Sequence, residues 1–584
     1  MLYSEIAETL KKVEDTTKRL EMTDYLVDLL KRTDAEIMDI VVYLIQGKIA
    51  PDFMGIEIGI AEKSMLRALH MATGIPYEEI EELYIRHGDV GIVAEDVMKR
   101  KRQMSLFSED LTVERVHSTF LEISKKEGKG TQDLRMKMLA NLFHDAKRLE
   151  ARYLSRMAIS RLRLGIADMT LLDALSIAFG EKSDRERVER AYNIFPDMGR
   201  IAKVLAEKGM GGLDEIKITV GVPIRAMLAE RLRSLPEIIE KMGGKAAFEY
   251  KYDGIRIQAH ISDDVKLFSR HLEDMTAQFP DVAEALKNAF KGRGVIVEGE
   301  TVPVDMNTGE MLPFQVVSHR RGRKYGLKEA VEDYPVVMFL FDALYLDGKD
   351  LTLMPYLKRR ETLSEAFDVS DRVKISEVLI TGDPEEAERF FNEAIDVGCE
   401  GIMAKSISED SIYRAGARGF LWIKYKKDYR SEMSDTVDLV PVGAFMGRGR
   451  RAGKYGALLM AAYNPDRDMF ETVCKLGSGF TDEDLENLPK IFEPDVIKER
   501  HPRVDSKMEP DVWFVPNFVL EVLGAEISLS PNHTCGYGVI KEDAGLAIRF
   551  PRFTGNWRKD KGPEDATTTD EIIRMYEMQK KVEQ

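Results

Sequence analysis

The sequence predicts a multidomain protein of mixed α and α+β class, with an all-α N-terminal domain, an α+β middle domain and a small C-terminal β-barrel. A chain of 584 residues is too long for a single hydrophobic core and divides most simply into three domains. Helical periodicity dominates up to about residue 215. Strands and helices then alternate, and short apolar runs between glycine turns follow from about residue 430. We therefore expect domains at 1–215, 216–429 and 430–584.

Composition and charge restrict the class of protein further. Hydrophobic residues make up 44% and charged residues 32% of the chain, as in a soluble globular protein with a densely charged surface. No apolar run is long enough to cross a bilayer, and the N-terminus lacks a signal segment. Cys399, Cys474 and Cys535 are too dispersed for a zinc site or a disulfide framework, so we expect a cytoplasmic protein.

The net charge bears on nucleic-acid binding. A formal charge of −16 argues against a nucleic-acid partner only if the basic residues are evenly spread, because only the contacting face must be positive. Arg148, Arg152 and Arg156 recur every four residues and share one helical face. A solvated face with scattered ion pairs would carry more acids, so we interpret this stripe as a contact for nucleic-acid phosphates. The basic, glycine-containing loop 125–130 suits the same role.

The stretch 248–256 contains the most informative lysine of the middle domain. Apolar and polar residues alternate up to Lys251, which predicts a strand with Glu249 and Lys251 on one face. Asp253–Gly254 supplies a tight turn, and Arg256 begins the next strand. Alone, such a pattern is more often a surface hairpin with solvated charges, so a functional interpretation needs further residues downstream.

Four later strands begin or end in polar groups. Residues 295–300 end in two carboxylates, 339–345 place an aromatic before an acid, 400–405 run from a carboxylate to a lysine, and 422–426 put two lysines on one face. With the lysine stretch, they resemble in order, spacing and residue type the nucleotidyltransferase motifs of ATP-dependent DNA ligases and mRNA capping enzymes. Residues 268–270 and 417–419 fit auxiliary positions of the same family.

The resemblance implies a role for each of these residues. Lys251 would be the catalytic nucleophile that takes AMP from ATP through a P–N bond. A free lysine has a pKa of about 10.4 and is therefore almost fully protonated at neutral pH. Nearby Lys424 and Lys426 would disfavour this charged form and would also hold the α-phosphate. Phe341 would stack on adenine. The other expected nucleotide contacts are Glu249, Arg256, Arg270, Glu300 and Arg418.

A divalent metal is also implied. Glu300 and Glu400 are the expected contacts for Mg²⁺, or Mn²⁺ in its place. Magnesium prefers carboxylate, phosphate and water oxygens, so it needs few protein ligands.

The C-terminal third suits a small β-barrel of the oligonucleotide-binding (OB) type. Short apolar runs at 437–445, 456–463 and 469–476 are separated by turns, and the basic, glycine-rich loop 448–454 suits contact with nucleic acid. Near the end, 548–553 and 558–567 resemble the last ligase motif, which approaches the pyrophosphate in that family. The resemblance therefore implies that Arg549, Lys559 and Lys561 orient the leaving group.

The resemblance covers essentially the whole chain and is to the archaeal and eukaryotic replicative type of ATP-dependent DNA ligase. It implies a helical DNA-binding domain, an adenylation domain and an OB-fold domain that act as a monomer on nicked duplex DNA in replication, repair and recombination. An mRNA capping guanylyltransferase or an RNA ligase would share the lysine and the barrel but not a helical domain of this size. A non-catalytic scaffold would be expected to lack some residues of the nucleotidyltransferase motifs, whereas all of them are present in this sequence.

Gln103, Leu106 and Phe107 resemble the peptide that docks on replication sliding clamps. The resemblance implies that the clamp is a partner.

Overall fold

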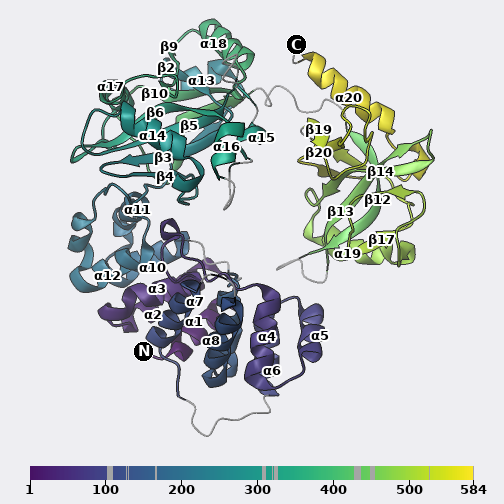
Figure 1. Ribbon diagram of the computed structural model, residues 1–584, viewed down its shortest axis with the longest axis horizontal. Coiled ribbons are helices and arrows are strands. Elements are labelled where there is room, and N and C mark those ends of the chain that lie inside the picture. The colour runs from purple at the N-terminus through teal and green to yellow at the C-terminus, as the bar shows by residue number, and fades with distance from the viewer. Residues whose placement is uncertain are drawn as a thin grey trace. The chain divides into compact units, whose positions relative to one another are not determined.

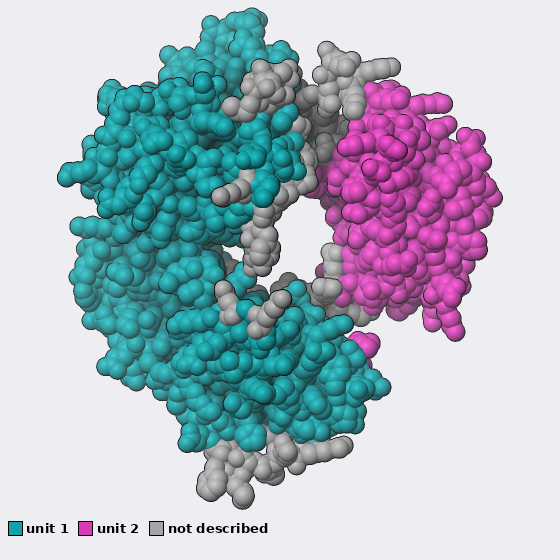
Figure 2. All heavy atoms as spheres, in the orientation of Figure 1, with its two compact units in different colours: residues 1–84, 90–427 teal, residues 85–89, 428–584 magenta. Residues whose placement is uncertain are grey.

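The computed structural model describes residues 1–100, 109–126, 128, 130–162, 164, 168–304, 311–312, 314–318, 320, 327–426, 436–447, 454–524 and 526–582. The chain forms two compact units, residues 1–84 with 90–427 and residues 85–89 with 428–584 (Figure 2). The domain boundaries expected at 215/216 and 429/430 stay a prediction. Within the described ranges, no helix is long and apolar enough to cross a membrane.

Helices fill the first unit up to residue 208 (Figure 1). Their apolar residues recur at helical spacing: α1 buries Tyr3, Ile6, Leu10 and Val13 in the core that the helices share. The helices are α1 (Tyr3–Glu14), α2 (Arg19–Arg32), α3 (Met38–Gln46), α4 (Glu62–Thr73), α5 (Tyr77–His87), α6 (Val90–Lys99), α7 (Val113–Ser124), α8 (Thr131–Asp145), α9 (Arg148–Ala158), α10 (Asp168–Phe179), α11 (Arg185–Ile194) and α12 (Met198–Lys208).

The predicted phosphate-binding stripe on α9 is wrong for two of its three arginines. Arg156 is only 3% exposed, and its Nη2 lies 3.1 Å from Glu14 Oε1. Arg152 bridges Glu14 at 2.7 Å and Glu95 at 2.9 Å. Both arginines therefore tie α9 to α1, and Arg152 also ties it to α6. Arg148 remains 53% exposed and is the one member of the stripe that is open to solvent.

Two sheets and several helices form the rest of the first unit. The first sheet has the order β1 (Leu228–Arg231), β11 (Arg418–Lys426), β10 (Gly401–Ser406), β2 (Ala246–Lys251), β9 (Val378–Thr381). The second has the order β4 (Val265–Ser269), β3 (Ile255–Ile261), β5 (Val295–Pro303), β6 (Val336–Leu346), β7 (Lys349–Asp350), with β8 (Val373–Ile375) beside β6. The helices here are α13 (Leu235–Lys241), α14 (Pro280–Ala289), α15 (Phe314–Ser318), α16 (Leu327–Asp333), α17 (Tyr356–Ala366) and α18 (Pro384–Asp396).

The first sheet has an apolar and a polar face. Phe248, Ile402 and Ile423 are buried with residues of α13 and α18 in one core cluster. Side chains alternate between the faces of a strand, so the neighbours of these residues in β2, β10 and β11 point the other way. The polar face therefore carries the glutamate and the lysines that the sequence singles out.

The second unit is rich in strands that form curled sheets, which confirms the predicted fold class. Strand β12 pairs with β13, β17 and β18, and β14 pairs with β13 and β16. Its elements are β12 (Val437–Met446), β13 (Tyr455–Asn464), β14 (Met469–Leu476), α19 (Asp482–Phe492), β15 (Val496–Ile497), β16 (Val504–Asp505), β17 (Val512–Phe514), β18 (Leu520–Leu523), β19 (Glu526–Ser530), β20 (Gly545–Arg549), β21 (Arg552–Trp557) and α20 (Thr569–Val582).

Candidate active site

A pocket of about 340 Å³ is lined by residues of both sheets of the first unit. This volume lies in the range of small-molecule sites. The pocket brings together every residue that the sequence predicts around the nucleotide and metal in this unit: Glu249, Lys251, Arg256, Arg270, Glu300, Phe341, Glu400, Arg418, Lys424 and Lys426.

Lys251 is the last residue of β2 and lies beside the ends of the adjacent strands β10 and β11. Gly401 is in register with Lys251 of β2 on one side and with Lys426 of β11 on the other. Glu400, which precedes Gly401, therefore meets both lysines: its Oε2 lies 2.5 Å from Lys251 Nζ and 2.8 Å from Lys426 Nζ. Burial would raise the pKa of Glu400, but the two ammonium groups lower it. Lys251 thus pairs with a carboxylate that it shares with Lys426, one of the two predicted lysine neighbours.

Two glycines allow this close approach of strands. At Gly401, whose φ is +149°, an added Cβ would lie 2.2 Å from the carbonyl oxygen of Tyr425. At Gly254, in the turn after Lys251, a Cβ would lie 2.4 Å from the carbonyl oxygen of Thr301. Backbone atoms cannot yield to such contacts, so only glycine fits at either position.

The second sheet contributes a carboxylate and an arginine from neighbouring strands. Glu300 of β5 is in register with Arg256 of β3. Burial raises the pKa of Glu300 to about 7, against the opposing effect of Lys251 and Arg256, and the acids Glu400 and Asp253 add to the rise. A cation would relieve this crowding of carboxylates.

The donor set fits a divalent metal that is held only partly by protein. In the described chain, no three or more His, Cys, Asp or Glu side chains are grouped so that they could hold a metal ion. Glu300 and Glu400 offer hard carboxylate oxygens in the same pocket, and substrate phosphates with water can complete the coordination of such a metal.

The cations that line the pocket repel one another. Burial and then the charges of Arg256 and Arg418 lower the pKa of Arg270. Burial followed by repulsion from Lys426 and Lys251 lowers the pKa of Lys424. These crowded positive charges favour a polyanionic ligand, such as a chain of phosphates.

Arg256 is held from several sides. Its Nη2 lies 2.7 Å from Glu298 Oε2, and its Nη1 donates to the carbonyl oxygen of Met227 at 2.9 Å. The guanidinium carbon lies 5.4 Å from the ring centre of Phe341 and 5.5 Å from that of Trp422. Arg256 is therefore fixed beside the aromatic side chains of the pocket.

Glu249 is the most enclosed acid of the pocket, at 2% exposure. It binds Lys405, Arg360 and the hydroxyl of Tyr356. Sequence reasoning missed all three partners. The sequence does place Lys405 at the end of a predicted strand, whereas no local signal marks Tyr356 or Arg360.

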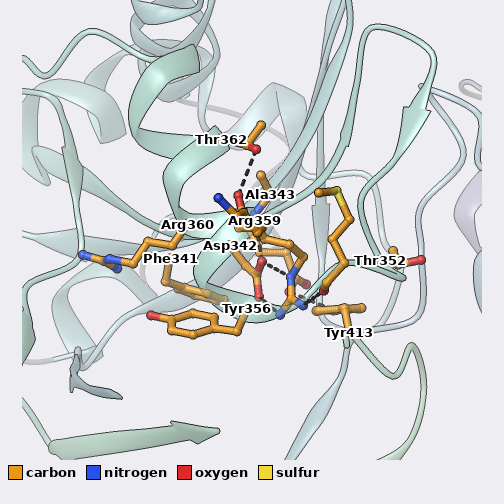
Figure 3. Close-up of polar contacts among 12 residues, drawn as sticks. Phe341, Asp342, Ala343, Thr352, Tyr356, Arg359, Arg360, Thr362 and Tyr413 are labelled. Atoms are coloured by element: carbon orange, nitrogen blue, oxygen red, sulfur yellow. Dashed lines mark hydrogen bonds and ion pairs between the residues drawn. The ribbon is translucent and has the colours of Figure 1, made fainter. Parts of the chain in front are cut away.

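Helix α17, which carries Tyr356 and Arg360, is itself anchored. Figure 3 shows Arg359 reaching the carboxylate of Asp342, the residue that follows Phe341 in β6. The two contacts are 2.7 and 3.0 Å long, and both side chains are fully buried. The helix and the strand that carries Phe341 are therefore joined directly.

The remaining predicted residues lie outside this pocket's unit or outside the described ranges. In the second unit, Arg549 Nε donates to Ser528 Oγ at 2.5 Å, and Lys561 Nζ lies 2.7 Å from Asp438 Oδ2. Lys559 is exposed. Arg558, which the sequence reasoning did not select, shares Asp438 with Lys561 at 2.7 Å. Gln103, Leu106 and Phe107 fall in 101–108, and most of the loop 448–454 falls in 448–453, both outside the described residues.

The two sheets, with a lysine at the end of a strand in a pocket of small-molecule size, match the class that the sequence motifs predict, a nucleotidyltransferase. Three family models match it: "DNA ligase N terminus" at residues 2–176, "ATP dependent DNA ligase domain" at 226–426 and "ATP dependent DNA ligase C terminal region" at 451–561. The DNA ligase of Caldivirga maquilingensis is 52% identical over 593 residues, which cover 99% of this chain and 98% of that protein. The chain belongs to the ATP-dependent DNA ligase family and is of the archaeal type.

Other similar proteins agree. DNA ligase 2 of Korarchaeum cryptofilum is 53% identical over 586 residues, covering 100% of this chain and 98% of that protein. A solved structure named Pmar-Lig_PreS3 matches with a TM-score of 0.55 at 17% identity, over 95% of this chain and 99% of that chain, and so supports the fold alone. The alternative of a capping enzyme or an RNA ligase is not favoured. Membership of this family implies the use of ATP and a divalent metal and action on nicked DNA.

Proposed function

We propose that Lys251 is the nucleophile with which this ligase seals single-strand nicks. The Lys251 amine attacks the α-phosphate of ATP, forms a P–N bond and releases pyrophosphate. The AMP then passes to the 5′-phosphate of a nick, and the 3′-hydroxyl displaces it to form the phosphodiester bond. The observation that carries this proposal is the position of Lys251 Nζ in the pocket, beside the cationic group and the carboxylates.

The other pocket residues hold the nucleotide. Phe341 stacks on the base, Glu249 and Arg256 contact the base and the ribose, and Arg270 and Arg418 bind the phosphates. Lys424 and Lys426 hold the α-phosphate near Lys251. Their positive charges stabilise the negative charge that develops on the phosphate oxygens during transfer.

Glu300 and Glu400 hold the divalent metal, which is Mg²⁺, with Mn²⁺ able to replace it. When bound, the metal neutralises phosphate charge. Attack requires the free amine, so the ion pair between Lys251 and Glu400 must open and the ammonium group must lose a proton. In the second unit, Arg549, Lys559 and Lys561 orient the pyrophosphate that leaves.

The test is covalent labelling with ATP that carries a radioactive α-phosphate. The native protein should yield a protein–AMP band, and Lys251→Ala should yield none. Lys245→Ala is the matched control, since Lys245 is an exposed lysine just before the same strand. Labelling of Lys251→Ala at the native level would refute the assignment. Parallel reactions with GTP and NAD determine which nucleotide the pocket accepts.

We also propose that Gln103, Leu106 and Phe107 bind the replication sliding clamp and that the ligase itself is a monomer. The double substitution Leu106→Ala, Phe107→Ala should abolish clamp pull-down and leave protein–AMP formation unchanged. Clamp capture that survives the substitution would refute the first part of this proposal. A molecular mass above that of one chain in light scattering would refute the second.

A further inference from the structure

We propose that Tyr356 and Arg360 of α17 are positioning residues that set the base selectivity of the pocket by fixing the carboxylate of Glu249. The inference rests on the proposed function, in which this pocket binds a nucleoside triphosphate. It concerns how the site distinguishes one purine from another, and it assigns that role to a helix outside every motif that the sequence presents.

The hydrogen bonds of Glu249 are unevenly distributed. Its Oε1 accepts from the Tyr356 hydroxyl and from Arg360 Nη1, the latter at 2.8 Å. Its Oε2 lies 2.7 Å from Lys405 Nζ. A carboxylate has about four acceptor sites on its two oxygens. Glu249 binds these three donors among the residues that the structure describes, which leaves one acceptor site, on Oε2. Glu249 also lines the pocket.

A single acceptor site in an enclosed setting distinguishes purines by their 6-substituent. The 6-amino group of adenine donates a hydrogen bond and satisfies it. The 6-carbonyl of guanine is itself an acceptor, so the two oxygens would repel and neither would be satisfied. A buried polar group without a partner is costly, and sites built around one hydrogen bond therefore reject analogues that cannot make it.

The selectivity requires that the carboxylate does not rotate. Tyr356 and Arg360 are four residues apart, so both side chains leave the same face of α17. The helix cannot shift easily, because Arg359 is bound to Asp342 and Arg360 Nη2 also donates to the carbonyl oxygen of Ser376 at 2.5 Å. Without Tyr356 and Arg360, both acceptor sites of Oε1 become free and Lys405 alone holds the group.

Lys405 has a different task. Its Nζ lies 4.9 Å from the ring centres of Phe341 and Tyr356 and 4.6 Å from that of Trp422. It also donates to the carbonyl oxygen of Phe341 at 3.1 Å. Because this ammonium group supports the aromatic side chains, its replacement would disturb stacking as well as base reading. Tyr356 and Arg360 are therefore the better positions to test.

The test compares ATP, GTP and purine riboside triphosphate, which is ATP without its 6-amino group. Intact-mass spectrometry of the full chain measures the half-saturating concentration and maximal rate of adduct formation for each nucleotide. The variants are Tyr356→Phe, which removes one hydroxyl, Arg360→Met, and Arg360→Lys as the conservative replacement. Lys358→Met is the matched control, because Lys358 lies on the same helix and its side chain is 63% exposed.

We expect Tyr356→Phe and Arg360→Met to reduce the preference for ATP over purine riboside triphosphate at least tenfold. The loss should come from a higher half-saturating concentration of ATP, with the analogue nearly unaffected. The preference for ATP over GTP should fall in parallel, Arg360→Lys should recover part of it, and Lys358→Met should match the native protein.

Equal weakening of ATP and of the analogue would overturn the inference, because a purely structural role affects both alike. An unchanged preference for ATP in both variants would also overturn the inference. In that case, nucleotide adducts that still depend on Lys251 would leave the proposed function intact. If the native protein forms no adduct with any nucleotide, the proposed function fails and this inference fails with it.

Discussion

His260 is a buried side chain whose charge state should couple folding to pH. Its Nδ1 accepts from the backbone N–H of Gly221 at 3.0 Å, and its Nε2 lies 2.9 Å from Gln258 Oε1. Burial, with the nearby charge of Lys266, lowers the pKa of His260 from 6.5 to about 3. Below pH 6.5 the unfolded chain therefore binds a proton that the folded chain cannot, and the free energy of unfolding falls as the pH falls.

Replacement of His260 by glutamine should remove this dependence, since an amide can both accept from Gly221 and donate to Gln258. Between pH 7 and pH 5 the native protein should lose about 2 kcal/mol more unfolding free energy than His260→Gln, as expected for a group whose pKa falls by several units on folding. Urea unfolding at both pH values measures the difference. Equal losses in the two proteins would contradict the prediction.

At single residues, the sequence was informative where the chemistry is local. Lys251, Glu300 and Phe341 lie at strand positions whose alternation can be read from a few neighbours, and all three line the pocket. Tyr356 and Arg360 could not be found this way. Their partner Glu249 is 107 and 111 residues away in the chain, and nothing in the sequence of α17 distinguishes them from other helical residues.

Among the helices, α9 shows how a correct periodicity can support a wrong function. Arg152 and Arg156 do share a face, but that face meets Glu14 of α1, which is 138 and 142 residues away. Acids are scarce only in the local sequence of α9, and the acids that pair with these arginines come from α1 and α6. Strands β2, β10 and β11 were predictable for the opposite reason: each has an apolar face that packs against helices and a polar face that lines the pocket.

The ion pairs of α9 lead to a stability prediction. Arg156→Met should lower the free energy of unfolding by about 3 kcal/mol, because it removes a buried charged partner of Glu14. It should leave the affinity for nicked DNA within about twofold, which would separate a structural role from a phosphate contact. Thermal unfolding and fluorescence anisotropy measure the two effects. Arg148→Met, at an exposed position, is the control and should change stability by less than about 0.5 kcal/mol.

For the whole molecule, the net charge of −16 and action on DNA are compatible if local positive surfaces make the contact. Binding should then weaken strongly with salt. With roughly six phosphates neutralised, affinity for a nicked duplex should fall by about 10³ between 50 and 200 mM KCl. Anisotropy titrations with Lys251→Ala, which is expected not to turn over, measure the slope. A salt-independent affinity would contradict binding through the phosphate backbone.

The three donors around Glu249 also limit how this protein could be re-engineered or could evolve. Substitution of Glu249 alone would leave Lys405 and Arg360 as neighbouring cations without their shared anion, at a cost of several kcal/mol, which is a large fraction of the stability of a typical domain. Replacement of Glu249 itself therefore requires compensating changes at Lys405 in β10 and Arg360 in α17 at the same time. The nucleotide preference of this chain is therefore coupled to the folding stability of the domain that contains the pocket.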